Sequence, residues 1–319
     1  MKHIHVLAVG EALVDLISDT EHHSLIDARI FILYPGGEVA NVASNVARLG
    51  GSSAVVTRVG DDSFGLFLRS HLAAAGVETS YVHTTLHTPT TLTIVARQTE
   101  TPDFVVYRGA DACLVPDDMP ESLLDSTALV HTSAFSLSRE PARSTILAFV
   151  EKAHASGCLV SFDPNYHSRL WDIHEQPLTV FQKICPFVSI IKPSLDDCER
   201  LFGAGIAPEI YAARFLEMGV QQVVLTMGGV GVLLVNADGT RYFPNNPVHV
   251  VDVTGAGDSF WSGLLLATLD GCAMADAIRV AQAVAEIKLQ QVGPLSLAID
   301  RHELYARLGI VAPMIDKQG

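Results

Sequence analysis

The sequence predicts an α/β fold with a central, mostly parallel sheet covered by helices on both faces and a small inserted β lid. Short β-branched runs alternate with longer segments of helical periodicity, which is typical of a parallel sheet wrapped by helices. The 319 residues are 49% hydrophobic and 18% charged, which is enough apolar side chain for one large core. Two segments contain strands with no helix between them, and these predict the lid. We expect a single domain over residues 1–319.

The core of the sheet is expected from β-branched runs at Ile4–Val9, Ser53–Val59, Leu129–Ser133, Cys158–Phe162, Phe187–Ile191, Gln222–Thr226 and Gly231–Val235. Helices are expected where apolar residues recur at helical spacing, at Ala40–Leu49, Gly65–Ala75, Ser144–Ser156, Pro208–Met218, Gly257–Leu269 and Ala273–Gln291. The lid is predicted from residues 13–35 and 89–108. The second lid segment is expected to be a hairpin that turns near residues 100–103.

Charge and cysteine usage narrow the class of protein. A formal net charge of −14 disfavours nucleic acid and anionic membrane as partners, so an anionic ligand needs a local site. The five cysteines are odd in number and form no Cys-x-x-Cys pair, which argues against a disulfide framework or a zinc knot. The apolar run before Glu11 is too short for a signal peptide, and no apolar stretch approaches bilayer length. We therefore expect a cytoplasmic protein.

The most informative stretch is a glycine-rich turn at the start of a predicted helix. Gly255 and Gly257 have no Cβ, so backbone N–H groups around Ala256 can converge on an anion at the positive helix end. Asp258 lies beside this anion hole and is placed to accept the proton of an attacking hydroxyl. An isolated Gly-x-Gly is more often an ordinary turn capped by Asp, so the functional interpretation depends on the rest of the chain.

Other phosphate-binding and metal motifs are missing from the sequence. No Gly-Lys dipeptide occurs, which excludes a Walker A loop, and no Gly-x-Gly-x-x-Gly follows the strand that ends at Val9, as a nicotinamide-binding turn would require. His-Glu-x-x-His is absent as well, and the thirteen histidines are scattered in a way that favours surface positions over metal ligation.

The run Asp252-x-Thr254-Gly-Ala-Gly-Asp258-Ser-Phe resembles the C-terminal signature of the ribokinase-like (PfkB) carbohydrate kinases. The run Gly36–Asn41 resembles their N-terminal Gly-Gly-x-x-x-Asn signature. Further blocks resemble the family at their expected places, namely Tyr107–Asp111, Phe162–Tyr166, Lys192–Asp197 and Thr226–Gly231. The resemblance covers nearly the whole chain and implies a ribokinase-like three-layer sandwich. It also implies that the anion hole serves phosphoryl transfer from ATP, with Asp258 as the base.

On the sugar side, the resemblance implies hydroxyl partners where strands of the core and lid end. Asp15 would accept hydrogen bonds from the sugar, Gly36 and Gly37 would let the sugar approach backbone, and Asn41 would offer a donor and an acceptor. Without the motif, Asp15 would be a loop acid and Asn41 a helix cap.

Arg108 would pin the sugar or the transferred phosphate, although an ion pair with Asp111 explains it equally well. Asp163 and Asn165 resemble a block that supports the substrate and metal shell. In that block His167 stands where many fructokinase-like relatives have Arg, and Arg169 follows two residues on.

On the nucleotide side, the resemblance assigns ATP contacts to Lys192, Ser194, Asp197, Thr226, Gly228, Gly231 and Gln282. Ser194 also fits a helix N-cap, and both roles remain open. Asp197 would hold Mg²⁺ through water, since Mg²⁺ keeps several of its waters. Asp252 and Thr254 resemble the ligands of a monovalent-cation site, which implies K⁺ next to the anion hole.

These features predict an ATP-dependent sugar kinase that phosphorylates a primary hydroxyl of a small sugar. Fructose, giving fructose 6-phosphate, is the preferred substrate, because Glu11–Asp15 and the Asp163–Tyr166 block look closest to the fructokinase branch. A 2-keto-3-deoxygluconate kinase is the alternative, and a catalytically silent sugar-sensing protein is a second one. The expected partners are the sugar and ATP, and the sequence leaves a homodimer open.

Overall fold

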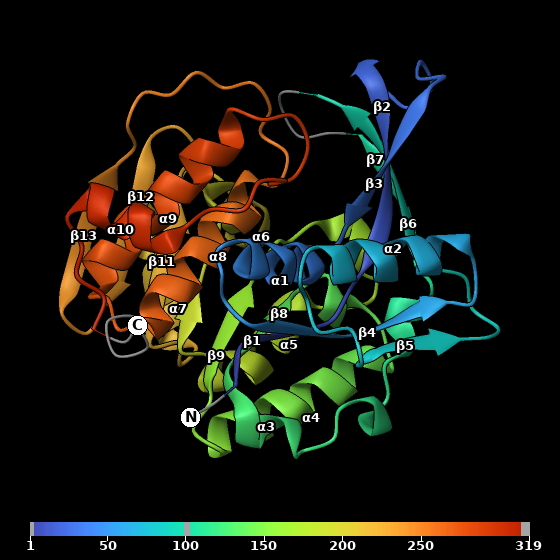
Figure 1. The fold of residues 1–319 in the computed structure, drawn as a ribbon, viewed down its shortest axis with the longest axis horizontal. Coiled ribbons are helices and arrows are strands. Elements are labelled where there is room, and N and C mark those ends of the chain that lie inside the picture. The colour runs from blue at the N-terminus through green and yellow to red at the C-terminus, as the bar shows by residue number, and fades with distance from the viewer. Residues whose placement is uncertain (1–2, 99–102, 314–319) are drawn as a thin grey trace.

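The computed structural model describes residues 3–98 and 103–313, whose strands form two sheets (Figure 1). The larger sheet has the strand order β13-β12-β11-β10-β9-β8-β1-β4-β5. Its strands are β1 (Ile4–Val9), β4 (Ser53–Gly60), β5 (Val82–Thr85), β8 (Thr127–Ser133), β9 (Leu159–Asp163), β10 (Ile190–Ile191), β11 (Gln222–Thr226), β12 (Gly231–Asn236) and β13 (Gly239–Pro244). All neighbours are parallel except at one edge, where β11, β12 and β13 pair antiparallel.

Strand β1 shows why this sheet carries helices on both faces. Val6, Leu7, Ala8 and Val9 are all fully buried. Successive strand side chains point to opposite faces, so Val6 joins the core on one side and Leu7 the core on the other. A strand that is apolar on both faces is stable only when both are covered.

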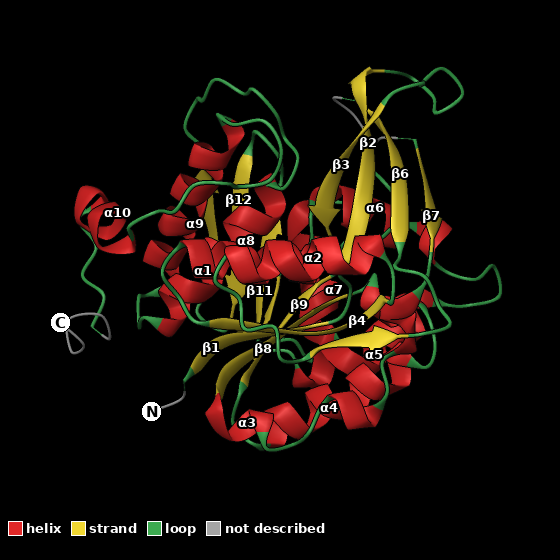
Figure 2. Ribbon diagram, turned by 45° about the vertical axis from the view of Figure 1, so that its right-hand side comes forward, coloured by secondary structure: helices red, strands yellow, loops and turns green. Residues whose placement is uncertain are grey.

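Two helical layers supply that cover (Figure 2). One layer consists of α1 (Glu38–Arg48), α2 (Ser63–Ala74), α8 (Ala256–Leu269) and α9 (Met274–Leu289), with α10 (Arg301–Leu308) packed on α9. The other layer consists of α3 (Leu123–Ser126), α4 (Ala142–Ala155), α5 (Pro177–Ile184), α6 (Leu195–Phe202) and α7 (Pro208–Glu217). The three-layer α/β sandwich predicted from the alternation of elements is therefore confirmed.

The smaller sheet stands beside the main one and has the order β3-β2-β6-β7. Its strands are β2 (Leu13–Glu21), β3 (Phe31–Gly36), β6 (Leu92–Arg97) and β7 (Phe104–Tyr107). They come from the two segments that were predicted to form the lid. β6 and β7 pair antiparallel, as a hairpin requires. The expected turn at Glu100, Thr101 and Pro102 lies outside the described residues.

Some elements differ from the sequence-based expectation. The strand predicted at Phe187–Ile191 shortens to β10, because Pro186 lies in a 3₁₀ turn over Cys185–Phe187. Helices α5 and α6 were not predicted, since each has only eight residues and a short apolar stripe. In the described part of the chain, no helix is both long enough and apolar enough to cross a membrane.

Candidate active site

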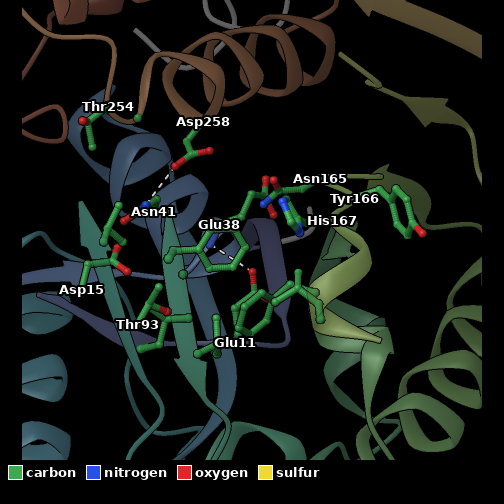
Figure 3. Close-up of a pocket in the computed structure, with 18 of the residues that line it drawn as sticks. Glu11, Asp15, Glu38, Asn41, Thr93, Asn165, Tyr166, His167, Thr254 and Asp258 are labelled. Atoms are coloured by element: carbon green, nitrogen blue, oxygen red, sulfur yellow. Dashed lines mark hydrogen bonds between the residues drawn. The ribbon is translucent and has the colours of Figure 1, made fainter. Parts of the chain in front are cut away.

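A cavity of about 780 Å³ lies between the lid and the C-terminal ends of the main-sheet strands (Figure 3). Its polar wall comes from the segments after β1 and β9, the lid, the first turn of α1, the exposed side of α6, and the approach to and first turn of α8: Glu11, Asp15, Glu38, Asn41, Thr93, Asn165, Tyr166, His167, Asp196, Arg200, Thr254 and Asp258. Its apolar wall consists of Leu13, Val95, Phe104, Val106, Phe135 and Leu170. Ligands of parallel sheets bind at this end of the strands, so the cavity is the candidate active site.

Asp258 projects into this cavity from the first turn of α8. The helix begins after Gly255, whose φ of +73° lies in the left-handed region that glycine adopts without strain. The side-chain amide of Asn41 donates a hydrogen bond of 2.8 Å to the Asp258 carboxylate (Figure 3). Burial raises the pKa of Asp258 to about 6, although the Asn41 hydrogen bond and the ammonium groups of Lys192 and Lys288 oppose the rise. The carboxylate is thus a stronger base than an exposed aspartate, yet mostly ionised at neutral pH.

The turn before Asp258 offers backbone donors to an anion. Ala256 donates its N–H to the Val253 carbonyl, and Ser259 donates to the Gly255 carbonyl. Within the described residues, the N–H groups of Gly257 and Asp258 have no acceptor, as expected in the first turn of a helix. A Cβ built on Gly257 would meet only the Lys192 ammonium, at 3.9 Å. The turn therefore faces open space with a cation beside it, which is a suitable place for a phosphate.

Asp15 lies on the lid side of Asp258, with Asn41 between them (Figure 3). Burial, together with the charge on Asp258, raises the pKa of Asp15 to about 7, although a hydrogen bond from Thr93 opposes the rise. Gly36 ends β3 against the Asp15 carboxylate, so a side chain there would displace Asp15. Gly37 is the N-cap residue before α1, with φ +97°, and a Cβ on it would lie 2.7 Å from the Glu11 carbonyl oxygen. The Gly-Gly pair thus lets lid and helix meet at the cavity.

Two further acids at the cavity floor were not singled out from the sequence. The Glu11 carboxylate accepts hydrogen bonds from the Ser133 and Ser136 hydroxyls and, at 3.0 Å, from the Glu38 backbone N–H. Glu38 in turn contacts the fully buried His131 at 2.9 Å. Burial raises the pKa of Glu11 to about 7 and that of Glu38 well above its usual value. The only signal in the sequence was the position of these acids, one after a core strand and one inside the Gly-Gly motif.

Of the three basic residues that the sequence suggested for the sugar side, His167 lines the cavity, whereas Arg108 and Arg169 do not. Arg108 does not line it, because its guanidinium pairs with Asp111 at 2.7 Å and donates to the Phe135 carbonyl. Arg169 is exposed and pairs with Asp103 at 3.1 Å, outside the lining. His167 does line the cavity, edge-on to Phe104, and burial lowers its pKa, so the ring is neutral at pH 7.

The Asp163–Asn165 block contributes one residue to the cavity wall and one residue that lies buried behind it. Asp163 is buried behind the cavity and forms an ion pair of 2.8 Å with Lys192. Asn165 lines the cavity with a positive φ of 30°, held by its backbone N–H, which donates to Asp163. Burial works against the charged form of Lys192, but Asp163 raises its pKa on balance. Lys192 is therefore a buried cation beside the anion-binding turn.

Ser194 and Asp197 form a reciprocal cap at the start of α6. Asp197 donates its N–H to the Ser194 hydroxyl at 3.0 Å, and the Asp197 carboxylate accepts the Ser194 N–H at 2.9 Å. The other Asp197 oxygen accepts the Tyr166 N–H at 2.7 Å. The capping role open for Ser194 is thus present, and both Asp197 oxygens are engaged by protein donors.

The remaining nucleotide-side residues gather beyond this cap, outside the cavity. Thr226 ends β11 and donates its N–H to Pro193, which places it next to Ser194. Gly228, with φ +54°, lies in the turn before β12, and nothing would meet a Cβ built on it within 4 Å. Gly231 has a φ of +148°. A Cβ built on it would lie 2.4 Å from the Phe243 carbonyl oxygen of β13, so glycine is required at this position. Gln282 donates to Asn245 at 2.8 Å, and Asn245 donates to the Gly228 carbonyl.

Asp252 and Thr254 lie in the strap that leads into α8. The Asp252 carboxylate accepts the Thr254 N–H at 3.0 Å, the Thr254 hydroxyl at 2.9 Å and the Gly293 N–H at 2.7 Å. Across the described residues, no group of three or more His, Cys, Asp or Glu side chains is arranged to hold a metal ion.

Comparison with known proteins gives this geometry a context. Residues 3–300 match the model of the pfkB family carbohydrate kinases. The chain is 36% identical over 294 residues to an ATP-dependent 6-phosphofructokinase of Thermoanaerobacterium thermosaccharolyticum, covering 92% of this chain and 90% of that protein.

Two solved structures are similar along nearly their whole length. The structure of Halothermothrix orenii fructokinase matches with a TM-score of 0.79 and 33% identity, covering 92% of this chain and 99% of that one. The aminoimidazole riboside kinase of Salmonella enterica, solved with aminoimidazole riboside and an ATP analogue, matches with a TM-score of 0.82 and 28% identity, covering 95% and 99%.

Proposed function

The chain belongs to the pfkB family of carbohydrate kinases and is an ATP-dependent sugar kinase, and from that premise we propose that its substrate is fructose, phosphorylated on a primary hydroxyl. The observation that carries the proposal is the position of Asp258, a buried carboxylate held by Asn41 between the cavity and the open space before the α8 turn. The sugar binds in the lid cavity and ATP approaches the α8 turn from the side of β11.

The chemistry follows from the geometry around Asp258. The sugar hydroxyl oxygen attacks the γ-phosphorus of ATP, its proton passes to the Asp258 carboxylate, and the bond to the β-phosphate oxygen breaks to release ADP. The N–H groups of Gly257 and Asp258, together with the Lys192 ammonium, stabilise the negative charge on the transferring group. Asn41 holds the base in the orientation that faces the cavity.

Magnesium fits this site as an ion brought by ATP. Mg²⁺ keeps several waters and neutralises charge on the β- and γ-phosphates. Asp197 is suited to a water-mediated contact rather than a direct one, because Ser194 and Tyr166 already engage both of its carboxylate oxygens. The open turn at Gly228 and the Gln282–Asn245 contact beside it would frame the nucleotide.

The charge of the cavity favours a neutral sugar over an anionic one. Five carboxylates line it: Glu11, Asp15, Glu38, Asp196 and Asp258. Among the described residues that line the cavity, Arg200 is the one with a permanently positive side chain. It forms ion pairs with Asp196 at 3.6 Å and Asp197 at 3.9 Å. A substrate carboxylate or phosphate needs charged or multiple donors in such a cleft, since an unpaired buried anion is very costly. Fructose needs only hydroxyl partners, and Asp15 and Asn41 supply them.

Two anionic substrates are therefore the alternatives to test. One is 2-keto-3-deoxygluconate, and the other is fructose 6-phosphate, because a relative with 36% identity is a 6-phosphofructokinase. In either case Arg200 is the residue that would hold the acidic group. We expect kcat/KM for fructose to exceed both others by about tenfold or more, because an unpaired buried anion costs more than the ~1.4 kcal/mol that corresponds to tenfold. The reverse order, with R200A selectively removing use of the anionic sugar, would move the assignment to that sugar.

The direct test of the mechanism replaces the proposed base. Asp258→Asn should retain sugar and ATP binding and lower kcat by about 10²-fold or more, as loss of a positioned general base does. Asp276→Asn is the matched control, because Asp276 occupies the first turn of α9 but lies away from the cavity in an exposed pair with Arg279. Near-normal turnover of Asp258→Asn, or an equal loss in Asp276→Asn, would contradict the assignment of Asp258.

A further inference from the structure

Lys288, near the end of α9, is a fully buried lysine whose ammonium is held mainly by backbone carbonyls. Its Nζ donates to the Asp252 carbonyl oxygen at 2.6 Å and to the Gln291 carbonyl oxygen at 3.4 Å. The nearest carboxylate oxygen, on Asp252, is 3.9 Å away. A lysine is rarely buried this completely unless its ammonium group is paired or hydrogen-bonded, because removing an ammonium from water is costly.

The carbonyls that hold this ammonium belong to the support of the anion-binding turn. Asp252 begins the strap that leads through Thr254 to Gly255, the residue before α8. The Asp252 carboxylate ties the strap to Gly293 at 2.7 Å, and the Val251 N–H donates to the Leu289 carbonyl at 2.8 Å. Lys288 thus joins the end of α9 to the segment that positions Asp258 and its neighbouring N–H groups.

A monovalent cation at this place would need the carbonyl and carboxylate oxygens of Asp252 as ligands. These oxygens already accept hydrogen bonds from the protein, so the arrangement does not fit an additional ion. The Asp252 carbonyl is already bonded to the Lys288 ammonium. Both Asp252 carboxylate oxygens are engaged, one by the Thr254 N–H and hydroxyl and the other by the Gly293 N–H. A bound K⁺ replaces its hydration shell with several oxygens at once, and a second positive charge beside the ammonium would be repelled.

We propose that the Lys288 ammonium is a built-in replacement for a monovalent cation, so that this kinase is active without K⁺. Its position supports two effects. The hydrogen bonds fix the strap before Gly255, and the positive charge lies behind the turn where phosphate charge develops. Lys288 is a positioning residue on this view, because it acts through the strap rather than by touching substrate.

The wild-type protein provides the first test, which needs no variant. Phosphorylation of fructose is measured in buffers whose cation is K⁺, Na⁺ or tetramethylammonium at equal ionic strength. We expect kcat and the KM for ATP to agree within about twofold among the three, and Tm without substrates to be equally unaffected, because no cation binds. Activation by K⁺ of about tenfold or more, or a Tm rise specific to K⁺, would overturn the proposal.

A pair of variants separates charge from packing. Lys288→Ala opens space beside the Asp252 and Gln291 carbonyls, whereas Lys288→Met fills it with an uncharged chain of similar length. Lys288→Ala should lose activity in tetramethylammonium and recover at least part of it in K⁺ or NH₄⁺, with a cation-dependent rise in Tm. Lys288→Met should lose activity without recovery. Lys183→Ala, in the last turn of α5 in the opposite helical layer, is the control and should show no cation response.

The outcomes separate this inference from the proposed function on which its activity assay rests. Tm is read without sugar, so a cation response in Lys288→Ala and its absence in the wild type support the inference even if fructose is the wrong substrate. Failure of Lys288→Ala to respond to any cation, or full activity of Lys288→Met, would overturn it. If neither variant folds, the cation independence of the wild-type Tm and kinetics decides.

Discussion

Substitution of Gly257 tests whether the α8 turn binds phosphate, because the structure separates the effect on folding from the effect on catalysis. A Cβ on Gly257 would approach only the flexible end of Lys192, at 3.9 Å, and its φ does not lie in the left-handed region. The free protein can therefore accept alanine or valine here. The added methyl groups would lie where the γ-phosphate must approach the backbone N–H groups.

The expected magnitudes follow from these contacts. Replacing glycine by alanine where the backbone is compatible stabilises a protein by about 0.4–1 kcal/mol, so Gly257→Ala should not lower Tm. Loss of one oxyanion-type donor typically lowers kcat by roughly 10²–10³-fold. We expect Gly257→Val to reach about 10²-fold with a raised KM for ATP, and Gly257→Ala to show a smaller loss in the same direction.

Gly263 in the same helix provides the matched control. A Cβ there would lie 3.0 Å from Val284 and 3.1 Å from Ala281, so Gly263→Ala overpacks the α8–α9 interface at a cost of about 1–3 kcal/mol. Its Tm should fall while its KM for ATP stays unchanged. Steady-state kinetics and thermal unfolding are measured together on all three variants. A folded Gly257→Val with wild-type kinetics, or one whose Tm falls like that of Gly263→Ala, would refute the reasoning.

Three further predictions concern the cavity. Because the base must be ionised and the pKa of Asp258 is raised to about 6, kcat/KM should fall as pH drops through about 6, and a midpoint near 4 in a rate profile would contradict this. Asp15→Ala should impair use of fructose more than Arg169→Ala, since only Asp15 lines the cavity, and equal losses in kcat/KM would count against that arrangement. Glu11→Gln should unfold near the wild-type temperature, whereas Glu11→Ala should lower the free energy of unfolding by about 2–3 kcal/mol, because it leaves the hydroxyl donors of Ser133 and Ser136 unpaired. Denaturant titration of both variants measures this difference, and a Glu11→Gln variant less stable than Glu11→Ala would contradict it.

The sequence was sufficient for features that neighbouring residues encode. β1 and β11 have the predicted bounds, because each has a central run of apolar, largely β-branched residues and is followed by a glycine-containing turn. The start of α8 was predicted to within one residue, since Gly255 and Gly257 mark the turn and Asp258 the first helical residues. The anion hole followed from the same local pattern, in which glycines expose backbone donors at a helix N-terminus, whereas its role in phosphoryl transfer was implied by the family resemblance.

Short or context-dependent elements could not be predicted in this way. β10 has two residues, Ile190 and Ile191, and its pairing with β9 and β11 defines it rather than its own sequence. The role of Arg108 also stayed open, because an arginine in a hairpin can reach either a ligand or a nearby acid. The structure places it on Asp111.

Local dihedral preferences and hydrophobic period thus determined the fold class, the strand–helix order and the place of the anion-binding turn. Only the tertiary structure decided which side chains meet across the chain. The side chains of Asn41 and Asp258, which are 217 residues apart, form a hydrogen bond of 2.8 Å, and Lys288 of α9 donates to the carbonyl of Asp252 in the strap before α8. Such contacts depend on how α1, α8 and α9 pack over the sheet, and packing is set by the whole core rather than by the residues that use it.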